Sequence, residues 1–267
     1  MSAPDAVAAA ERGLLEVRGL VKRFGGVTAV NALDMTVRSG DIHALIGPNG
    51  SGKTTTLNVI SGLYRADDGS VGFDGTELAR LPAHGIARRG IARTFQNIRL
   101  FGELSVLENV MIGRHVRTTV GFLSALLPGG PTAREERATR DFARDMLRFV
   151  GLEQAAAQTA RSLPYGDQRR VEIARALASE PRLLLLDEPA AGMNPTETDA
   201  LVELLRAIRA RGTTLLLIEH DMNLVMAISD RLTVLNFGQH IAEGPPAEIA
   251  HHPDVIAAYL GGTLDAA

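Results

Sequence analysis

Short apolar runs alternate along the chain with longer segments whose apolar side chains share one face. The runs at 41–46, 183–186 and 213–218 are almost wholly apolar and predict buried strands. The segment 132–150 has apolar side chains at helical spacing, with Arg and Glu on its other side, and predicts an amphipathic helix. Strands that alternate with helices make a parallel sheet, and ligands gather at the carboxyl ends of its strands. The core is therefore predicted to have an α/β fold.

The amino-terminal part predicts antiparallel strands. Residues 14–24 alternate apolar and polar side chains, and Gly25 and Gly26 turn the chain before a second strand at 32–38. A third short strand is expected at 70–73. We therefore expect an antiparallel β part beside the α/β core.

The middle of the chain predicts helices. Ser105 begins a helix that extends to residue 115, and Glu108 completes a capping box there. No strong strand signal follows Gln96 until the apolar run at 183–186, so an inserted helical subdomain is expected over 85–178. Further helices are expected at 82–89, 166–179 and 195–211, and a hairpin at 232–243. The predicted divisions are a flexible leader at 1–13 and one domain at 14–267. This domain comprises the α/β core with its antiparallel β part at 14–84 and 179–243, the helical subdomain, and a tail at 244–267 with one or two short helices.

Composition and charge narrow the function classes. The 267 residues include no Cys, which excludes disulfides and cysteine metal sites. The formal net charge of −3 gives no basic field for nucleic acid, so no nucleic-acid partner is expected. No apolar run approaches the roughly 18 residues that indicate a membrane span.

One stretch carries specific chemistry. The residues at 47–54 fit the phosphate-binding pattern G-x-x-x-x-G-K-[ST], with a predicted strand before them and a predicted helix after them. Glycines let successive backbone N–H groups point at an anion, and the helix N-terminus favours negative charge. Lys53 can reach the terminal phosphates of a nucleotide, Thr54 can ligate Mg²⁺, and Thr55 can bond a phosphate oxygen. The alternative is a glycine-rich turn without a ligand. The predicted loop residues are Gly47, Pro48, Asn49, Gly50, Ser51, Gly52, Lys53, Thr54 and Thr55.

Two adjacent acids end the apolar strand at 183–186. Buried neighbouring carboxylates are unfavourable unless they have a partner or a task. Asp187 can hold Mg²⁺ through water, and Glu188 can take a proton from the water that attacks a γ-phosphate. The alternative is a solvated pair of acids at a strand end. The phosphate-loop pattern elsewhere in the chain makes this alternative the less favoured interpretation.

In these features the sequence resembles the ATP-binding cassette (ABC) ATPase family. Residues 163–170, Leu-Pro-Tyr-Gly-Asp-Gln-Arg-Arg, are similar to its signature, which is usually Leu-Ser-Gly-Gly-Gln. Gln96 matches the Q-loop glutamine and His220 the H-loop histidine. Phe24, 29 positions before Lys53, matches the aromatic residue that stacks on adenine. The resemblance covers nearly the whole chain and implies a P-loop NTPase core with a mostly parallel sheet.

The resemblance also implies the ligands and the roles of further residues. ATP and Mg²⁺ are the expected cofactors, and the expected reaction is hydrolysis of ATP to ADP and phosphate. Glu188, His220 and Gln96 are the expected catalytic residues, with Thr54, Gln96 and Asp187 at the metal. Ala29, with Val27, would complete the apolar pocket for the base, and the signature residues Tyr165, Gly166 and Asp167 would contact nucleotide. Taken singly, Phe24 is more typical of a core residue and His220 of a structural histidine.

The departures of the chain from the family pattern include Pro164, Asp167 and Asn194. Pro164 stands where the signature serine is usual, and Asp167 where a glutamine is usual. Asn194 replaces the D-loop aspartate. The lost hydroxyl and N–H at Pro164 would weaken a closed dimer, since a hydrogen bond to a charged phosphate is worth about 1.5–3 kcal/mol.

Within the family, the residues around Gln96 and the signature helix resemble the ATPases of importers for branched-chain and other hydrophobic amino acids. The long helical insert and the tail at 253–261 are similar to the larger of their two ATPase subunits, the LivG type. The resemblance implies a second ATPase subunit (a second copy or a related LivF-type subunit), two membrane permease subunits and, indirectly, a periplasmic or extracellular binding protein. It places the chain peripherally on the cytoplasmic face of the bacterial inner membrane. An exposed apolar cluster of Leu100, Phe101, Leu104 and Val106 would dock the permeases.

Other readings stay open at this stage. The chain also fits the ATPase of another ABC system, such as urea or amide import or envelope-lipid export. A soluble cassette protein without transport is a further alternative, as is a nucleotide-binding scaffold without turnover. For the apolar cluster, the alternative is plain helix packing.

Overall fold

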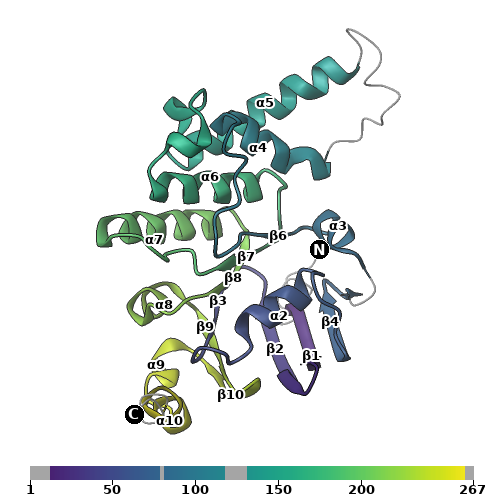
Figure 1. Ribbon diagram of the computed structural model, residues 1–267, viewed down its shortest axis with the longest axis vertical. Helices are drawn as coiled ribbons and strands as arrows, with labels where there is room; N and C mark the ends of the chain where they lie inside the picture. Colours follow the sequence, from purple (N-terminus) through teal and green to yellow (C-terminus); the bar gives the residue numbers. More distant parts are fainter. Residues whose placement is uncertain (1–12, 79–80, 118–130, 262–267) are drawn as a thin grey trace, which may run out of the picture.

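A six-stranded sheet forms the centre of the computed structural model, which describes residues 13–78, 81–117 and 131–261 (Figure 1). Its strand order is β10-β9-β3-β8-β7-β6, and every pair is parallel except β10 with β9. This confirms the predicted α/β core with a mostly parallel sheet. The strands are β3 (Ile42–Ile46), β6 (Ile91–Arg93), β7 (Leu183–Asp187), β8 (Thr214–Ile218), β9 (Arg231–Asn236) and β10 (Gln239–Gly244).

The leucine run of β7 shows why these strands are almost wholly apolar. Leu184 and Leu186 belong to one core cluster, while Leu183 and Leu185 belong to another on the opposite face of the sheet. Successive side chains of a strand point to opposite faces, so a strand covered on both sides needs apolar residues throughout. All residues of β3, β7 and β8 are buried.

An antiparallel sheet in the order β2-β1-β4-β5 covers one side of the molecule. The phosphate-loop helix α2 (Lys53–Ile60) packs Leu57 and Ile60 into the same cluster as this sheet and the central strands. The predicted antiparallel part is therefore present, and α2 lies between it and the core (Figure 1). Its strands are β1 (Gly13–Phe24), β2 (Val27–Arg38), β4 (Asp68–Phe73) and β5 (Thr76–Glu77). β2 begins five residues earlier than the sequence predicted, at Val27.

Helices cover the other face of the central sheet. α4, α5 and α6 pack against one another in the upper part of Figure 1, and the capping box at Ser105 is formed. The 85–178 boundary of the helical subdomain stays a prediction, and within it β6 pairs with β7 in the central sheet. The helices of this part are α3 (Ala83–Arg88), α4 (Val106–Arg114), α5 (Pro131–Phe149) and α6 (Tyr165–Leu177), with 3₁₀ turns η1 (His115–Arg117), η3 (Glu153–Ala155) and η4 (Ala160–Ser162).

Among the described residues, four helices follow β7 in the chain. The sequence predicted α7 (Pro195–Ala210) and one or two short tail helices; the structure has two, α9 (Pro246–Ile249) and α10 (Pro253–Gly261). It missed α8 (Met222–Ile228), which is seven residues long and is capped by the side chain of Asp221. The expected leader lies outside the described residues except for Gly13.

One predicted surface residue is in the core. The sequence grouped Val106 with Phe101 as an exposed apolar cluster, but Val106 is fully buried, whereas Phe101 is 54% exposed. Val106 is the first residue of α4 and packs in the core cluster that joins the helical layer to the sheet. For Val106 the alternative of helix packing is therefore correct.

A buried histidine lies in the central strand β3. The His43 Nε2 is 2.8 Å from Thr233 Oγ1, and Nδ1 has no hydrogen-bond partner. Burial and, to a smaller extent, the nearby charges of Arg231 and Arg38 together lower the pKa of His43 from 6.5 to about 3. His43 is therefore neutral in the folded protein at pH 5.

We predict that His43 makes the fold less stable in mild acid. Below pH 6.5 the unfolded chain takes up a proton at His43, while the folded chain does not until about pH 3. The unfolded state then binds more protons, so the free energy of unfolding falls as the pH falls, by about 2 kcal/mol between pH 7 and pH 5. Urea unfolding at both pH values should show this loss, and the loss should be smaller by that amount in His43→Gln. The exposed His240 gives the control variant His240→Gln, which should behave like wild type. If the free energy of unfolding of His43→Gln fell between pH 7 and pH 5 by as much as that of wild type, the prediction would be wrong.

Candidate nucleotide-binding and catalytic site

The phosphate-loop residues lie between β3 and α2, pressed against two other strands. Gly47 has φ 147° and Gly52 has φ 100°, conformations that favour glycine. A Cβ on Gly47 would lie 2.0 Å from the carbonyl oxygen of Leu235, and one on Gly52 would lie 2.3 Å from that of Ala29. The loop therefore has a close backbone fit that only glycine allows. Ala29 lies directly beside it.

Lys53 begins α2 and is 5% exposed. Its Nζ donates hydrogen bonds to the carbonyl oxygens of Gly47 and Pro48, both at 2.8 Å. Burial lowers the pKa of the ammonium, and the carboxylates of Glu188 and Asp187 oppose that shift. The structure thus brings the loop lysine and the two strand-end acids together. Asn49, Gly50 and Thr54 are exposed, Thr55 is half-buried, and Ser51 is buried.

Asp187 is buried at the end of β7. Its Oδ2 accepts a hydrogen bond from Arg93 at 2.9 Å, while its buried Oδ1 has no partner. The same guanidinium donates to Asn58 and Ser61 at the end of α2. Arg93, which the sequence analysis did not single out, thus ties the acid to the phosphate-loop helix. A buried carboxylate oxygen without a donor suits a cation or its bound water, so this position fits the expected Mg²⁺.

Glu188 is held between the other two predicted catalytic residues. Gln96 Nε2 donates to its Oε2 at 2.8 Å, and His220 Nε2 lies 2.8 Å from its Oε1. Because a carboxylate only accepts hydrogen bonds, Nε2 of His220 carries the hydrogen in this contact. Glu188 has φ 47°, in the left-handed region. Three segments far apart in the sequence therefore meet at one carboxylate.

A second carboxylate, which the sequence analysis gave no role, supports this group. Glu219 precedes His220 and is 4% exposed. It accepts hydrogen bonds from the backbone N–H of Ala190 at 2.7 Å and of His220 at 3.1 Å. Burial raises the pKa of Glu219, and backbone hydrogen bonds oppose the shift. Glu219 thus joins the segment after Glu188 to the segment that carries His220.

The predicted adenine-binding aromatic is exposed. Phe24 is 43% exposed and meets the ring of Tyr64 edge to face, with the ring centroids 5.2 Å apart. Tyr64 was not singled out from the sequence, because an isolated aromatic residue after a helix gives no pattern. Val27, opposite Phe24 in the β1–β2 pair, is 67% exposed. An exposed aromatic surface beside the phosphate loop fits a role in stacking, which stays a prediction.

The signature residues lie at the start of α6, against the segment between β7 and α7. Tyr165 is 43% exposed, and a Cβ on Gly192 would lie 3.4 Å from its ring. Gly166 is buried so closely that a Cβ would lie 2.7 Å from Glu197 Oε1. Asp167 is half-buried, 3.7 Å from Arg170. Asn194 caps α7 in a capping box with Glu197, so this departure from the family pattern has a structural use here.

The tail also reaches the phosphate loop. Burial raises the pKa of the Tyr259 phenol on α10, and a hydrogen bond with the backbone of Gly47 opposes that shift. Val255 and Ile249 anchor the tail helices in the main core cluster. The sequence analysis gave Tyr259 no role.

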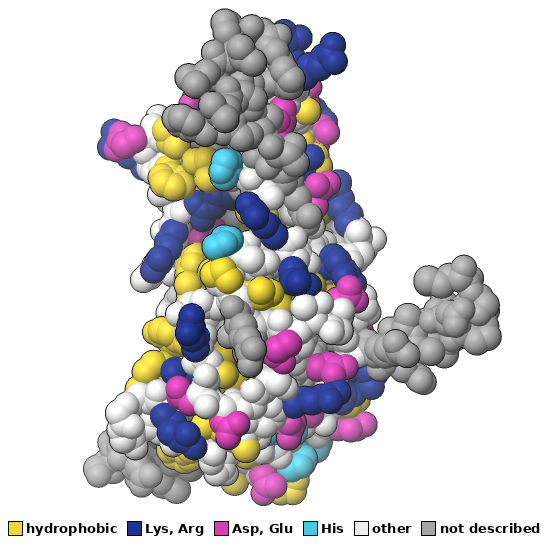
Figure 2. Space-filling view, turned by 90° about the vertical axis from the view of Figure 1, so that its right-hand side faces the viewer, with side chains coloured by type: hydrophobic (Ala, Val, Ile, Leu, Met, Phe, Trp, Pro, Cys, Tyr) yellow, Lys and Arg dark blue, Asp and Glu magenta, His cyan; other side chains and the backbone are white. Residues whose placement is uncertain are grey.

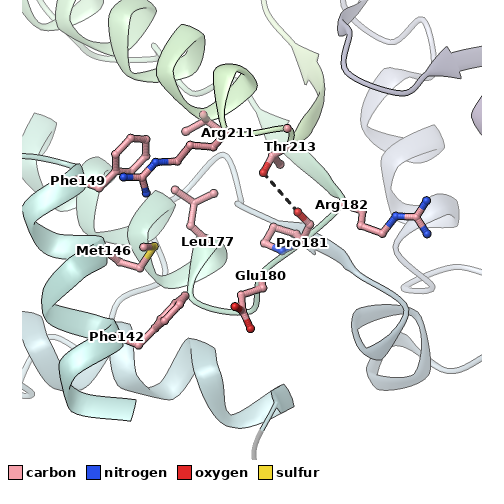
Figure 3. Close-up of a pocket in the computed structure, with 11 residues that line it drawn as sticks. Phe142, Met146, Phe149, Leu177, Glu180, Pro181, Arg182, Arg211 and Thr213 are labelled. Carbon is pink, nitrogen blue, oxygen red and sulfur yellow. Dashed lines mark hydrogen bonds between the residues drawn. The ribbon is translucent and has the colours of Figure 1, made fainter. Parts of the chain in front are cut away.

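An open hollow of about 350 Å³ lies away from these residues (Figure 3). Phe142, Met146 and Phe149 of α5 line it, together with the chain before β7 and β8. It therefore adjoins the amino ends of the parallel strands, whereas the phosphate loop and the acids follow the carboxyl ends. Among the described residues, no group of three or more His, Cys, Asp and Glu side chains is arranged to hold a metal ion.

Comparison with known proteins identifies the family. A sequence model described as ABC transporter matches residues 30–191, and one described as branched-chain amino acid ATP-binding cassette transporter matches residues 239–265. The chain belongs to the ABC transporter family. The predicted fold and family resemblance are therefore confirmed.

Individual members of the ABC family are similar over almost their full length. The high-affinity branched-chain amino acid transport ATP-binding protein BraF of Pseudomonas aeruginosa is 47% identical over 251 residues, which cover 94% of this chain and 98% of the relative. LivG of Salmonella typhimurium, with the same description, is 48% identical over 249 residues, covering 93% and 98%. The solved ADP conformation of an ATP-binding cassette of an ABC transporter superposes with a TM-score of 0.81 at 34% identity, covering 93% and 99%.

We predict that Lys53→Ala weakens ATP binding by roughly 10–100-fold, because a hydrogen bond to a charged phosphate is worth about 1.5–3 kcal/mol. Titration calorimetry of the purified chain measures this directly. Lys53→Met, which keeps most of the side-chain volume, should lose the same affinity, and thermal unfolding should show that both variants fold. Unchanged affinity would remove Lys53 from the site.

Proposed function

We propose that this chain binds and hydrolyses ATP to energise an importer of branched-chain or other hydrophobic amino acids. The observation that carries the hydrolytic part is the placement of Glu188 between Gln96 and His220, beside Lys53 and the phosphate loop. The substrate class is supported by the names of BraF and LivG and by the family model at residues 239–265.

Each residue then has a task that its position supports. Glycine N–H groups of the loop and Lys53 bind the phosphates, and Phe24 stacks on adenine beside Ala29. Thr54 and, through water, Asp187 hold Mg²⁺, which neutralises phosphate charge when it is bound. Glu188 accepts a proton from the attacking water. Gln96 and His220 fix the Glu188 carboxylate, and His220 is near enough to contact a γ-phosphate placed beside it.

Turnover requires a second ATPase subunit in this proposal. Tyr165 lies beside Gly192 in the segment before α7, Gly166 lies against Glu197 of α7, and Tyr165 is exposed at the surface. In a sandwich of two subunits, each signature would contact the nucleotide on the other subunit's phosphate loop. The partner is a second copy or a related LivF-type subunit.

Two membrane subunits and an external binding protein would complete the importer, with this chain on the cytoplasmic face of the bacterial inner membrane. The described helices include none long and apolar enough to cross a membrane. Phe101 is exposed, and its backbone is fixed by Asn109, which accepts from its N–H at 2.9 Å and donates to its carbonyl at 3.0 Å. This rigid presentation of an apolar side chain supports docking at Phe101.

A shallow groove of about 340 Å³ offers a second contact for the membrane subunits. It lies between α3 and the end of α4 and has a mainly apolar lining that includes Leu63, Ile86 and Ile112. Figure 2 views the side of the molecule on which α3 lies and shows Lys and Arg side chains gathered across the middle of this face. An apolar helix of the permease with acidic flanks would fit such a surface.

We predict that Phe101→Glu leaves ATP hydrolysis by the isolated chain near normal and reduces amino acid uptake at least 10-fold in vesicles with the complete importer. A charge buried in the apolar contact lacks a partner, so docking should fail. Ile256→Glu is the matched control, because Ile256 is 45% exposed on the tail helix α10. Normal uptake by Phe101→Glu would place the docking surface elsewhere.

We predict that Glu188→Gln binds ATP but hydrolyses it about 10²–10⁴-fold more slowly, since an amide is a far poorer base than a carboxylate. Lys53 and the loop are unchanged, so affinity should persist. Phosphate release measures turnover, and light scattering should show a larger species with ATP but not with ADP. Glu203→Gln, an exposed glutamate of α7, is the control. Normal turnover would exclude Glu188 as the base, and slow turnover without the larger species would discard a sandwich of this chain alone.

A further inference from the structure

The loop that carries Gln96 is held by the signature helix rather than by its own regular structure. The last backbone hydrogen bond that continues the pairing of β6 with β7 is donated by the N–H of Thr94 to the carbonyl of Leu185. The chain from there to Phe101 has no helix or strand. Backbone carbonyl groups in such a segment still need partners. Those of Phe95 and Gln96 find one on α6.

That partner is Arg169, a fully buried arginine. Its NH1 donates to Phe95 O at 2.6 Å, and its NH2 donates to Gln96 O at 2.7 Å. NH1 also donates to Glu172 Oε2 at 2.8 Å, and this carboxylate is 1% exposed. A planar guanidinium can hold two successive carbonyls and a carboxylate at once, which a lysine ammonium on a flexible stem cannot do in the same geometry.

The far end of the loop is held by the same helix. Glu172 Oε1 accepts from the N–H of Arg99 at 3.3 Å, and Arg175 donates to the carbonyl of Arg99. The segment 95–99 is therefore tied at both ends to three charged residues spaced three apart on α6. Such spacing places them on one face of the helix.

The contacts form a continuous path from the signature to the predicted base. Tyr165, a signature residue, has its hydroxyl 3.4 Å from Arg169 NH2. Arg169 binds the backbone of Gln96, and the side chain of Gln96 donates to Glu188. A shift of the start of α6 would therefore move the group that orients the Glu188 carboxylate.

We infer that Arg169 is a positioning residue for ATP hydrolysis: it fixes the backbone of Gln96 so that the glutamine amide reaches Glu188, and it links the signature helix to that contact. The inference rests on the proposed function, in which Glu188 is the base and Gln96 orients it. Arg169 itself touches neither nucleotide nor water in this account. Its effect should appear in the rate of turnover and not in the affinity for ATP.

The test compares Arg169→Lys and Arg169→Gln with wild type, and repeats each in a Gln96→Ala background. Full-length chains are assayed for kcat by phosphate release and for ATP affinity by calorimetry. Hydrogen exchange of the amide of Arg99 reports whether the loop has loosened. Arg206→Gln is the matched control: Arg206 also bonds a glutamate three residues away and a distant carbonyl, but it lies exposed on α7.

We expect Arg169→Lys to lower kcat by roughly 10–100-fold, as loss of a supporting partner typically does, with ATP affinity within about threefold of wild type. In the Gln96→Ala background the same change should lower kcat by no more than about twofold, because residues that act through one another are not additive. Exchange at Arg99 should accelerate, and Arg206→Gln should behave as wild type. Arg169→Lys keeps a buried positive charge beside Glu172, so it decides the question if Arg169→Gln does not fold.

Two results would overturn the inference and leave the proposed function intact. One is a normal kcat in Arg169→Lys when Gln96→Ala is slow. The other is an equally large loss of kcat with and without Gln96, which would mark Arg169 as a general structural residue. A normal kcat in Gln96→Ala would instead remove the proposed role of Gln96, and the inference with it.

Discussion

Three carboxylates lie at the carboxyl edge of the central sheet, and their need for hydrogen-bond and ion-pair partners is the constraint on which the site depends. Asp187 ends β7, Glu188 follows it, and Glu219 follows β8, the strand paired with β7. Each is compensated differently: Asp187 by a buried guanidinium, Glu188 by two side-chain donors, and Glu219 by backbone N–H groups. Removing one compensation would leave a poorly solvated charge, so the segments that supply the donors are locked to this edge.

This compensation explains how segments without regular structure are held. The chain around Gln96, the turn after Glu188 and the turn at His220 are irregular, yet each is fixed by a hydrogen bond to a carboxylate or a guanidinium. The two core clusters, one on each face of the central sheet, hold the strands that carry these segments, because β3, β7 and β8 contribute side chains to both clusters. Electrostatics at the edge and apolar packing below it thus act on the same strands.

The sequence carried most of the fold because its strongest signals are local. Leucine runs, the glycine loop and the Ser105 capping box depend on near neighbours, and each predicted element was found. The short helix α8 was missed since seven residues give too little periodicity. Val106 was wrongly predicted to be exposed, because the sequence gives the same signal for a buried and for an exposed apolar residue at the start of a helix. Arg93, Arg169 and Glu219 were given no role, since charged residues in a sequence indicate surface, and only the three-dimensional partners show that these are buried.

At Glu188 the left-handed backbone favours glycine, whereas the hydrogen bonds to Gln96 and His220 require a carboxylate. A non-glycine residue in this region carries strain on the order of 1–3 kcal/mol, whereas glycine would adopt it freely. Selection for thermal stability alone would therefore favour glycine here and discard the carboxylate. A stabilised version of this chain that keeps Glu188 has to gain its stability elsewhere. Under the proposed function, a relative with glycine at this position would be a cassette that binds nucleotide without hydrolysing it.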